Sequence, residues 1–247
     1  MNTASMTYHS PRYVVKSMGS KFGITPCFMA KPREGLPGNS GHMHVSLVEK
    51  AGKGKYGKNL FSRETRDSKP PYEDLAHLSD MGRHFLAGLL DGLPDVMPIV
   101  APTVNSYKRL VENFWAPVTV SWGLEHRAAS IRLIAPPTAS PKATRFEIRV
   151  AGADANPFLV LAAILALGWR GVEKKLEINV PPLGKGEGVG GASDKGVRLA
   201  KSLKEATAQM MREGSLAREV FGDDFVEHFG GTREHEVRLW DEAVTDW

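Results

Sequence analysis

The chain has 247 residues, of which 42% are hydrophobic and 24% charged, and its formal net charge is +4. This is the composition of a folded globular protein, with enough apolar residues for one large core or two smaller ones. The net charge is too small, and the charged residues too mixed along the chain, to indicate a nucleic-acid-binding protein. The single cysteine, Cys27, excludes an internal disulfide framework and fits a reducing compartment.

The hydropathy of the chain argues against export and against a membrane span. Residues 1–10 are polar and lack the basic start and apolar core of a secretory signal. The longest apolar run, residues 158–169, is shorter than the roughly 20 residues that a helix needs to cross a bilayer. We therefore expect a soluble, cytoplasmic protein whose partners include no membrane and no nucleic acid.

Three helices are expected in the first two thirds of the chain. Ser10-Pro11 has the form of an N-cap followed by a first-turn proline, which predicts a helix that ends at Gly23. Apolar residues at helical spacing predict a core-facing helix over residues 72–91. An Asn-Pro pair predicts the start of a long buried helix over residues 158–176.

The last third of the chain is also expected to be helical after a loop. Residues 184–191 are rich in glycine and predict a mobile loop, because no Lys-Ser/Thr helix start of a phosphate loop follows them. Ser202 and Glu205 have the spacing of a capping box, and residues 233–244 predict a final amphipathic helix.

A loop of small residues, 38–41, runs directly into an alternating segment, 42–49. Successive side chains of a strand point to opposite faces, so His42, His44 and Ser46 share one face while the other face can pack. Two histidines on one strand can offer imidazole to a metal, but two ligands alone make neither a structural nor a catalytic zinc site. A metallohydrolase would therefore need a third ligand close to this strand.

The middle of the chain predicts short strands, over residues 116–122, 129–134 and 145–150. Earlier in the chain, the apolar run 25–30 could pair with segment 42–49 as an antiparallel ribbon.

The strand predicted over residues 145–150 carries a charged face. The two-residue period puts Arg145, Glu147 and Arg149 together and leaves the intervening apolar side chains for the core. A carboxylate between two guanidinium groups could bind a divalent cation while the arginines bind anionic ligands. The alternative is a surface salt-bridge ladder.

Two further basic clusters precede that strand, at residues 105–109 and 126–132. Arginine binds phosphates and carboxylates bidentately, so several arginines that converge with a Glu and a His suit an acidic substrate or a nucleotide. The alternative is that each arginine lies on a solvated loop.

The order and spacing of these segments resemble the glutamine synthetase catalytic domain, in particular its C-terminal part. The resemblance runs from about Tyr13 to the end of the chain. It rests on residues 28–32, 38–47, 105–110, 126–132, 140–143 and 145–149, followed by the helix start at 156–158. Collinearity of this kind is far more specific than any one motif.

For the fold, we expect an α+β structure with a curved, mainly antiparallel sheet and helices outside it. Residues 1–247 would form the C-terminal part of the catalytic domain. The family's small N-terminal β domain and the first half of its catalytic domain would be absent. The full-length protein is expected to be a homo-oligomer.

The resemblance also implies a reaction. The family phosphorylates the side chain of glutamate with ATP, in the presence of Mg²⁺ or Mn²⁺, and displaces the acyl phosphate with ammonia. By resemblance, His42 and Glu147 would be metal ligands, Gly38 would belong to the glutamate loop, and Arg109 and Arg149 would hold glutamate or the developing phosphate. The residues expected to border or neutralise ATP are His44, Ser46, Arg127, Arg132, Lys142 and Arg145.

Two departures from the family pattern bear on activity. Trp115 stands where the ammonia-using enzymes carry a glutamate that deprotonates ammonium, and an indole cannot act as that base. This replacement resembles the branch of γ-glutamyl amine ligases, although Glu112 is a possible substitute. The carboxylates supplied by the first half of the family's catalytic domain are also absent, so an inactive fragment with a binding or assembly role is the alternative to a ligase.

Overall fold

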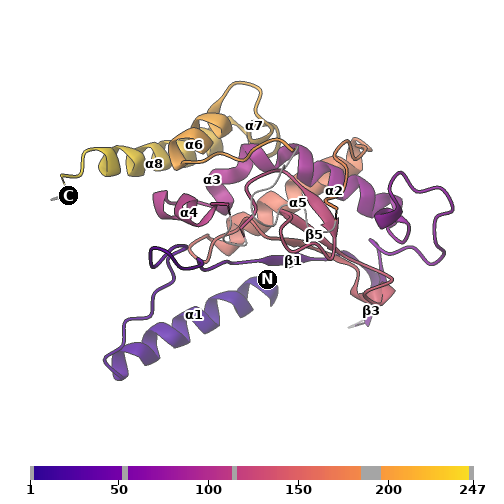
Figure 1. Ribbon diagram of the computed structural model, residues 1–247, viewed down its shortest axis with the longest axis horizontal. Helices are drawn as coiled ribbons and strands as arrows, with labels where there is room; N and C mark the ends of the chain where they lie inside the picture. The colour runs from indigo at the N-terminus through magenta and orange to yellow at the C-terminus, as the bar shows by residue number, and fades with distance from the viewer. Residues whose placement is uncertain (1–2, 52–54, 113–115, 185–195, 245–247) are drawn as a thin grey trace.

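The computed structural model describes residues 3–51, 55–112, 116–184 and 196–244 (Figure 1). At its centre is a four-stranded sheet with the strand order β1-β6-β5-β4. Strand β6 pairs antiparallel with β1 and with β5, whereas β4 and β5 are parallel. The four strands are β1 (Met43–Val45), β4 (Trp122–Leu124), β5 (Ile131–Ile134) and β6 (Arg145–Ile148).

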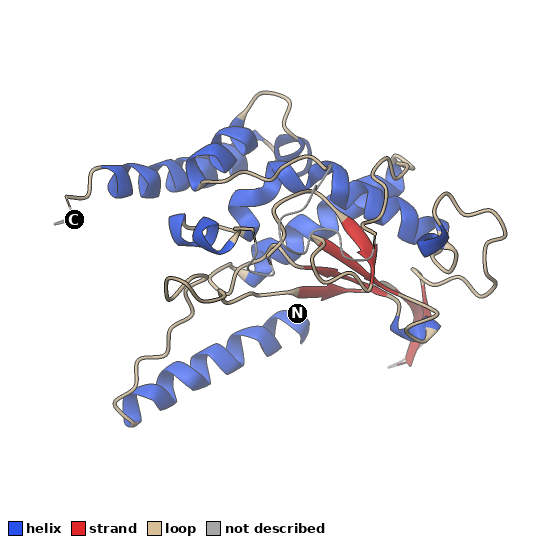
Figure 2. Cartoon of the chain, in the orientation of Figure 1, coloured by secondary structure: helices blue, strands red, loops and turns tan. Residues whose placement is uncertain are grey.

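A second, two-stranded antiparallel sheet pairs β2 (Val48–Ala51) with β3 (Lys55–Asn59). Helices pack around the central sheet, as Figure 2 shows. The expected α+β fold, a mainly antiparallel sheet with outer helices, is confirmed.

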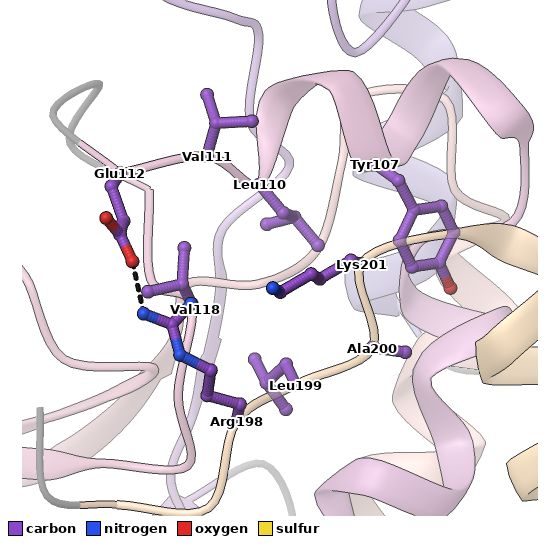
Figure 3. A pocket seen from close by; sticks show the side chains of 9 residues that line it. All are labelled: Tyr107, Leu110, Val111, Glu112, Val118, Arg198, Leu199, Ala200 and Lys201. Atoms are coloured by element: carbon purple, nitrogen blue, oxygen red, sulfur yellow. Dashed lines mark hydrogen bonds and ion pairs between the residues drawn. The ribbon is translucent and has the colours of Figure 1, made fainter.

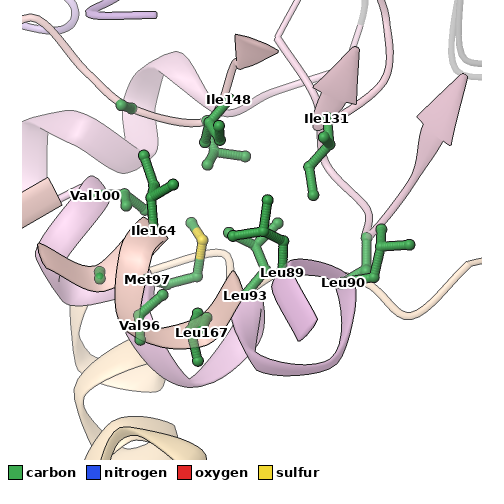
Figure 4. Packing of buried hydrophobic residues seen from close by; sticks show 14 of the residues in the cluster. Leu89, Leu90, Leu93, Val96, Met97, Val100, Ile131, Ile148, Ile164 and Leu167 are labelled. Carbon is green, nitrogen blue, oxygen red and sulfur yellow. The ribbon is translucent and has the colours of Figure 1, made fainter. Parts of the chain in front are cut away.

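The core lies between the sheet and two helices, α2 (Asp80–Gly92) and α5 (Pro157–Glu173). Ile131 of β5 and Ile148 of β6 are buried and belong to the same cluster as Leu89 of α2 and Ile164 of α5 (Figure 4). Burying each of these side chains contributes about 1.5–3 kcal/mol. This packing fixes which face of the sheet is left for polar chemistry.

The two core helices approach one another through glycines. A Cβ on Gly88 of α2 would lie 2.2 Å from the carbonyl oxygen of Leu167, and a Cβ on Gly171 of α5 would lie 2.1 Å from that of His84. Any side chain at these positions would push the helices apart, so the sequence needs glycine at both.

A short helical segment links the core helices to the C-terminal layer. It consists of η2 (Leu93–Val96), α3 (Met97–Val100) and α4 (Val104–Arg109), and the layer itself consists of α6 (Leu203–Met211), α7 (Leu216–Phe221) and α8 (Asp223–Asp241). Asp95 is buried at the junction. Its carboxylate accepts hydrogen bonds from Gln209 Nε2 at 2.7 Å and from the backbone N of Leu216 at 2.6 Å.

Helix α1 (Thr3–Lys21) runs along the lower side of the molecule in Figure 1. It begins earlier than the Ser10-Pro11 signal predicts, so Pro11 lies inside the helix, where it removes one intrahelical hydrogen bond. Gly23, with a φ of +64°, follows the helix as expected. Tyr13 and Met18 are exposed, so part of the apolar face of this helix is uncovered.

The helix expected over residues 72–91 is wrong in its first part. Residues Glu73–Leu75 form a short 3-10 turn, η1, and α2 begins only at Asp80. The hydroxyl oxygen of Ser79 accepts a hydrogen bond from the N–H of Gly82 at 3.0 Å. This N-cap sets the start of the helix, and the apolar periodicity before it belongs to the turn.

The ribbon expected between segments 25–30 and 42–49 is wrong. Strand β1 pairs with β6 instead, and residues 25–30 form no strand. Asn39 takes the place of a partner strand: its backbone N–H donates to the carbonyl of Ala30 at 2.7 Å and its Nδ2 donates to that of Met29 at 3.0 Å.

The strand expected over residues 116–122 is displaced to β4. The preceding residues instead join a segment far along the chain, through hydrogen bonds from Val120 N to Val197 O at 2.8 Å and from Leu199 N to Val118 O at 3.0 Å. The strands expected over 129–134 and 145–150 are confirmed as the shorter β5 and β6.

The remaining expected helices are confirmed in substance. The side-chain oxygen of Asn156 caps α5 by accepting from Phe158 N at 3.0 Å, and Ser202 caps α6 by accepting from Glu205 N at 3.1 Å. The carboxylate of Glu205 accepts from Lys201 N rather than from the cap residue, so half of the capping box forms. Helix α8 contains most of the expected final helix. The loop expected over 184–191 lies, beyond residue 184, outside the described residues.

Candidate anion and metal site

Glu147 is the centre of a row of polar side chains that crosses the sheet. In the strand register it stands beside His44 of β1 and Arg132 of β5. Residues in register on neighbouring strands project to the same face, and Phe146 and Ile148 on the other face are buried in the core. The alternation expected for β6 is therefore correct, but Glu147 is buried rather than part of a surface ladder.

The imidazole of His42 lies against the Glu147 carboxylate, with 2.8 Å between Nδ1 and Oε1. Burial, and then the charge of Arg149, lower the pKa of His42 to about 4 despite the neighbouring carboxylate. The ring is therefore neutral at neutral pH, and with the proton on Nδ1 it donates to Glu147. This tautomer leaves the lone pair of Nε2 available to a ligand.

Two arginines hold the same carboxylate. Arg149 Nη1 donates to Oε1 of Glu147 at 2.8 Å, and Arg132 Nη1 donates to Oε2 at 2.9 Å. Burial alone would raise the pKa of Glu147, but the charge of Arg149 and the hydrogen bond from Arg132 outweigh it and keep the pKa below its usual range. Glu147 is thus ionised at neutral pH.

Glu125 is a second carboxylate in this cluster, and the sequence patterns did not predict it. Its Oε2 accepts from Arg132 Nε at 2.9 Å and also from Nη2 of the same guanidinium, while Thr138 Oγ1 donates to its Oε1 at 3.0 Å. The backbone of Glu125 has a φ of 55°, an uncommon conformation for a residue other than glycine. Its only sequence signal is its place directly before the basic cluster 126–132.

Arg109 enters the region from α4 and is almost completely buried. Its Nη1 donates to the carbonyl of Val150 and its Nη2 to that of Arg149, both at 2.9 Å. Burial, and then the charge of Arg149, lower its pKa to about 10, which leaves it protonated. Gly38 packs beneath it: a Cβ there would lie 2.8 Å from Cγ of Arg109 and 2.3 Å from the carbonyl oxygen of Ala30. The structure thus brings these two residues together.

His44 and Arg145 form the outer end of the row. Arg145 Nε donates to Nδ1 of His44 at 3.0 Å, and Arg145 Nη1 donates to the carbonyl of Ala143 at 2.8 Å. Burial is the first cause that lowers the pKa of His44, which keeps the ring neutral and able to accept.

Three of the expected site residues are exposed and less closely tied to Glu147: Ser46, Arg127 and Lys142. Burial lowers the pKa of Arg149, and the charges of Arg132 and Arg127 act in the same direction. Arg127 therefore contributes to the positive field of the site. In the described part of the chain, the side chains of Ser46 and Lys142 form no hydrogen bond or ion pair with the polar row around Glu147. Their roles therefore stay predictions.

The residues present fit part of a metal site. His42 supplies a neutral imidazole and Glu147 an ionised carboxylate, the two protonation states that ligation requires. Among the described residues, however, no three or more His, Cys, Asp or Glu side chains gather as a group that could hold a metal. Since Mg²⁺ and Mn²⁺ prefer about six ligands, chiefly oxygens, His42 and Glu147 could occupy only two positions.

The chain is an α+β protein with a mainly antiparallel sheet, and an ionised carboxylate among arginines, beside a neutral imidazole, is an arrangement suited to anionic ligands. Residues 5–247 match the family model described as glutamine synthetase, catalytic domain. The chain belongs to the glutamine synthetase family, as its motifs predicted.

Relatives within the family include proteins named glutamine synthetase and a protein named as an amine ligase. The chain is 41% identical to type-1 glutamine synthetase 2 of Dictyostelium discoideum, over 96% of this chain and 42% of the relative. It is 37% identical to a glutamate–isopropylamine ligase of a Pseudomonas species, over 94% of this chain and 47% of the relative. The chain thus spans about half the length of the curated relatives it matches.

Solved structures agree with this assignment. GmaS without ligand superposes with a TM-score of 0.76 at 30% identity, covering 96% of this chain and 50% of that one. The complex of GmaS with ADP gives a TM-score of 0.78 at 28% identity, covering 98% and 52%. Among the described residues, no helix combines the length and apolar character of a membrane crossing.

Proposed function

We propose that this chain carries the anion-binding half of an ATP-dependent ligase that joins the γ-carboxyl group of glutamate to ammonia or an amine. The observation that carries the proposal is the Glu147 cluster: an ionised carboxylate held by Arg132 and Arg149 beside neutral His42. Phosphoryl transfer depends mainly on positioning and on neutralisation of charge by cations and arginines, and this cluster offers both.

The proposed reaction has two steps. A γ-carboxylate oxygen of glutamate attacks the γ-phosphorus of ATP, the P–O bond to ADP breaks, and γ-glutamyl phosphate forms. The nitrogen of ammonia or an amine then attacks the acyl carbon, the C–O bond to phosphate breaks, and the nitrogen loses a proton to a base.

His42 Nε2 and Glu147 would hold one divalent ion, Mg²⁺ or Mn²⁺, which when bound neutralises charge on the transferred phosphate. Arg149 faces the same carboxylate and would bind glutamate or the developing phosphate. Both terminal nitrogens of Arg109 donate hydrogen bonds to backbone carbonyls, those of Val150 and Arg149. Its proposed role is therefore to hold the backbone of Arg149 in position, and Gly38 leaves room for the Arg109 side chain. Arg132 and Arg145 would neutralise ATP with exposed Arg127 and Lys142, and His44 and Ser46 would border the nucleotide.

The identity of the nitrogen nucleophile is part of the proposal. Trp115, at the position where a base is expected, lies outside the described residues. Glu112, the possible substitute, is ion-paired with Arg198. This pairing makes Glu112 less available as a substitute base, and the preference for an amine rests on Trp115 at the position of that base.

An inactive fragment with a binding or assembly role is the second candidate, because the described residues supply only part of a metal site. The test is release of phosphate from ATP and Mg²⁺ by the 247-residue chain with glutamate, in parallel with ammonia, isopropylamine and ethanolamine. Glutamate-dependent turnover supports the ligase. ATP binding without turnover supports the binding role, and light scattering of the same sample tests the proposed homo-oligomer.

A further inference from the structure

A cavity of about 320 Å³ lies beside α4, between the residues that follow this helix and segment 198–201 (Figure 3). Tyr107 of α4 lines it, whereas Arg109 of the same helix reaches toward the Glu147 cluster. Two residues advance an α-helix by roughly 200°, so these side chains leave α4 on nearly opposite sides. The cavity therefore lies apart from the Glu147 cluster.

One part of the cavity wall is apolar and is held in place by the backbone, whereas the rest is polar and includes Glu112, Arg198 and Lys201. Leu110 and Leu199 are buried, and Val118 and the ring of Tyr107 also belong to the apolar part. Leu199 N donates to Val118 O at 3.0 Å, which ties two walls directly to one another. The volume is at the lower end of the range of about 300–1,000 Å³ typical of small-molecule pockets.

The charges around the cavity leave one positive charge uncompensated. Glu112 and Arg198 form an ion pair at one side, so they cancel. Burial raises the pKa of Tyr107, whose hydroxyl is therefore neutral. The ammonium group of Lys201 points into the cavity between Leu110 and Val118 in Figure 3.

The surroundings of Lys201 give it no counter-ion in the described part of the chain. The nearby carboxylate of Glu205 accepts the backbone N–H of Lys201, and none of the described ion pairs includes the Lys201 side chain. The side chain of Lys201 is exposed, so an ion pair with it would contribute little on its own, and apolar contact of the ligand with Leu110, Val118 and Leu199 would have to add to it.

We propose that this cavity binds a small aliphatic monocarboxylate. The carboxylate would pair with Lys201, and a chain of four or five carbons would lie against Leu110, Val118 and Leu199. The single uncompensated charge of Lys201 matches a monoanion better than a multiply charged anion such as phosphate. The proposed site lies apart from the Glu147 cluster and does not use Glu112 as a base, although Glu112 stands at its side.

The test is calorimetric titration of the 247-residue chain with isovalerate, inorganic phosphate and 3-methylbutan-1-ol. Isovalerate is expected to bind with millimolar affinity, and phosphate and the uncharged alcohol about tenfold more weakly or less, because each lacks one of the two matching features. Methyl NMR signals of Leu110, Val118 and Leu199 are expected to shift with isovalerate.

Lys201→Met keeps the length of the side chain and removes its charge, and is expected to weaken isovalerate binding about tenfold. Lys204→Met is the matched control, since Lys204 is a neighbouring exposed lysine that does not line this cavity, and it should bind as the unchanged chain does. Both residues are exposed, so the variants should fold, which circular dichroism checks. Absence of isovalerate binding, equal binding by Lys201→Met, or tighter binding of phosphate would each overturn the proposal.

Discussion

Glu125 and Glu147 bind the two edges of one guanidinium group, that of Arg132. Glu125 takes Nε and Nη2 on one side and Glu147 takes Nη1 on the other. An arginine held in this way cannot rotate, so its remaining surface has a fixed direction toward an incoming anion. Glu125 thus acts through Arg132, as a positioning residue for the proposed nucleotide site.

Glu125→Gln should weaken ATP binding by about tenfold, because a neutral amide holds the guanidinium of Arg132 less firmly than the carboxylate does. The free energy of unfolding should fall by only about 1–2 kcal/mol, since a hydrogen-bonded amide replaces the carboxylate. Titration with ATP and urea unfolding measure the two effects. The control is Glu64→Gln, which alters an exposed glutamate paired with Lys58 and should leave ATP affinity unchanged. If Glu125→Gln folds and binds ATP as before, Glu125 has no positioning role.

Gly38→Ala should destabilise the protein by about 1–3 kcal/mol, the usual cost of overpacking a well-packed site. The new Cβ would meet the carbonyl oxygen of Ala30 at 2.3 Å and Cγ of Arg109 at 2.8 Å, and the backbone atom cannot move aside cheaply. Gly231→Ala is the matched control: it lies in α8 with no atom within 4 Å of a new Cβ, and should stabilise the helix by up to about 1 kcal/mol. Thermal unfolding of both variants measures the difference. A Gly38→Ala protein as stable as the unchanged chain would contradict the close approach.

Much of this site was predictable because it lies on a strand. The two-residue period alone places Arg145, Glu147 and Arg149 on one face, and pairing of β6 with β5 then brings Arg132 into register. Glu125 was not predictable in the same way. Its position depends on a left-handed backbone turn after β4, and no hydrophobic period encodes that turn.

The fold differs from expectation where a specific hydrogen bond replaces the partner that the hydropathy pattern predicts. Residues 25–30 have the apolar character of a strand, yet the carbonyls of Met29 and Ala30 accept hydrogen bonds from Asn39 rather than from a partner strand. In the same way, the N-cap at Ser79 overrides a helical period that extends further back. A hydropathy pattern does not show which of these hydrogen bonds form, because they depend on where the folded chain places the donor and the acceptor.

Stability should fall as the pH is lowered from about 6.5 to about 4, because of His42. The folded-state pKa of about 4 lies below the usual 6.5, so the unfolded chain takes up a proton in this window and the folded chain does not. The lowered pKa of Glu147 adds a further loss below its usual 4.5, where the unfolded state again binds more protons. Urea unfolding at a series of pH values measures the slope.

His42→Gln should flatten this slope between about pH 6.5 and 4, since glutamine does not titrate. His228→Gln, at an exposed position on α8, controls for loss of a histidine as such and should keep the slope of the unchanged chain. An unchanged slope in His42→Gln would mean that other groups carry the pH dependence.

Asp95→Ala should loosen the C-terminal helices from the core. The Asp95 carboxylate is buried and accepts from Gln209 and from the first N–H of α7, besides an ion pair with Arg212. Its removal leaves the partly buried N–H of Leu216 without this partner and should cost about 1–3 kcal/mol. Hydrogen exchange should become faster in α6 and α7. It should not change in β5 and β6, because Asp95 makes no hydrogen bond to either strand. Asp95→Asn, which can still accept the backbone N–H, should recover part of the protection. If exchange rises equally in the sheet, Asp95 stabilises the whole fold rather than this junction.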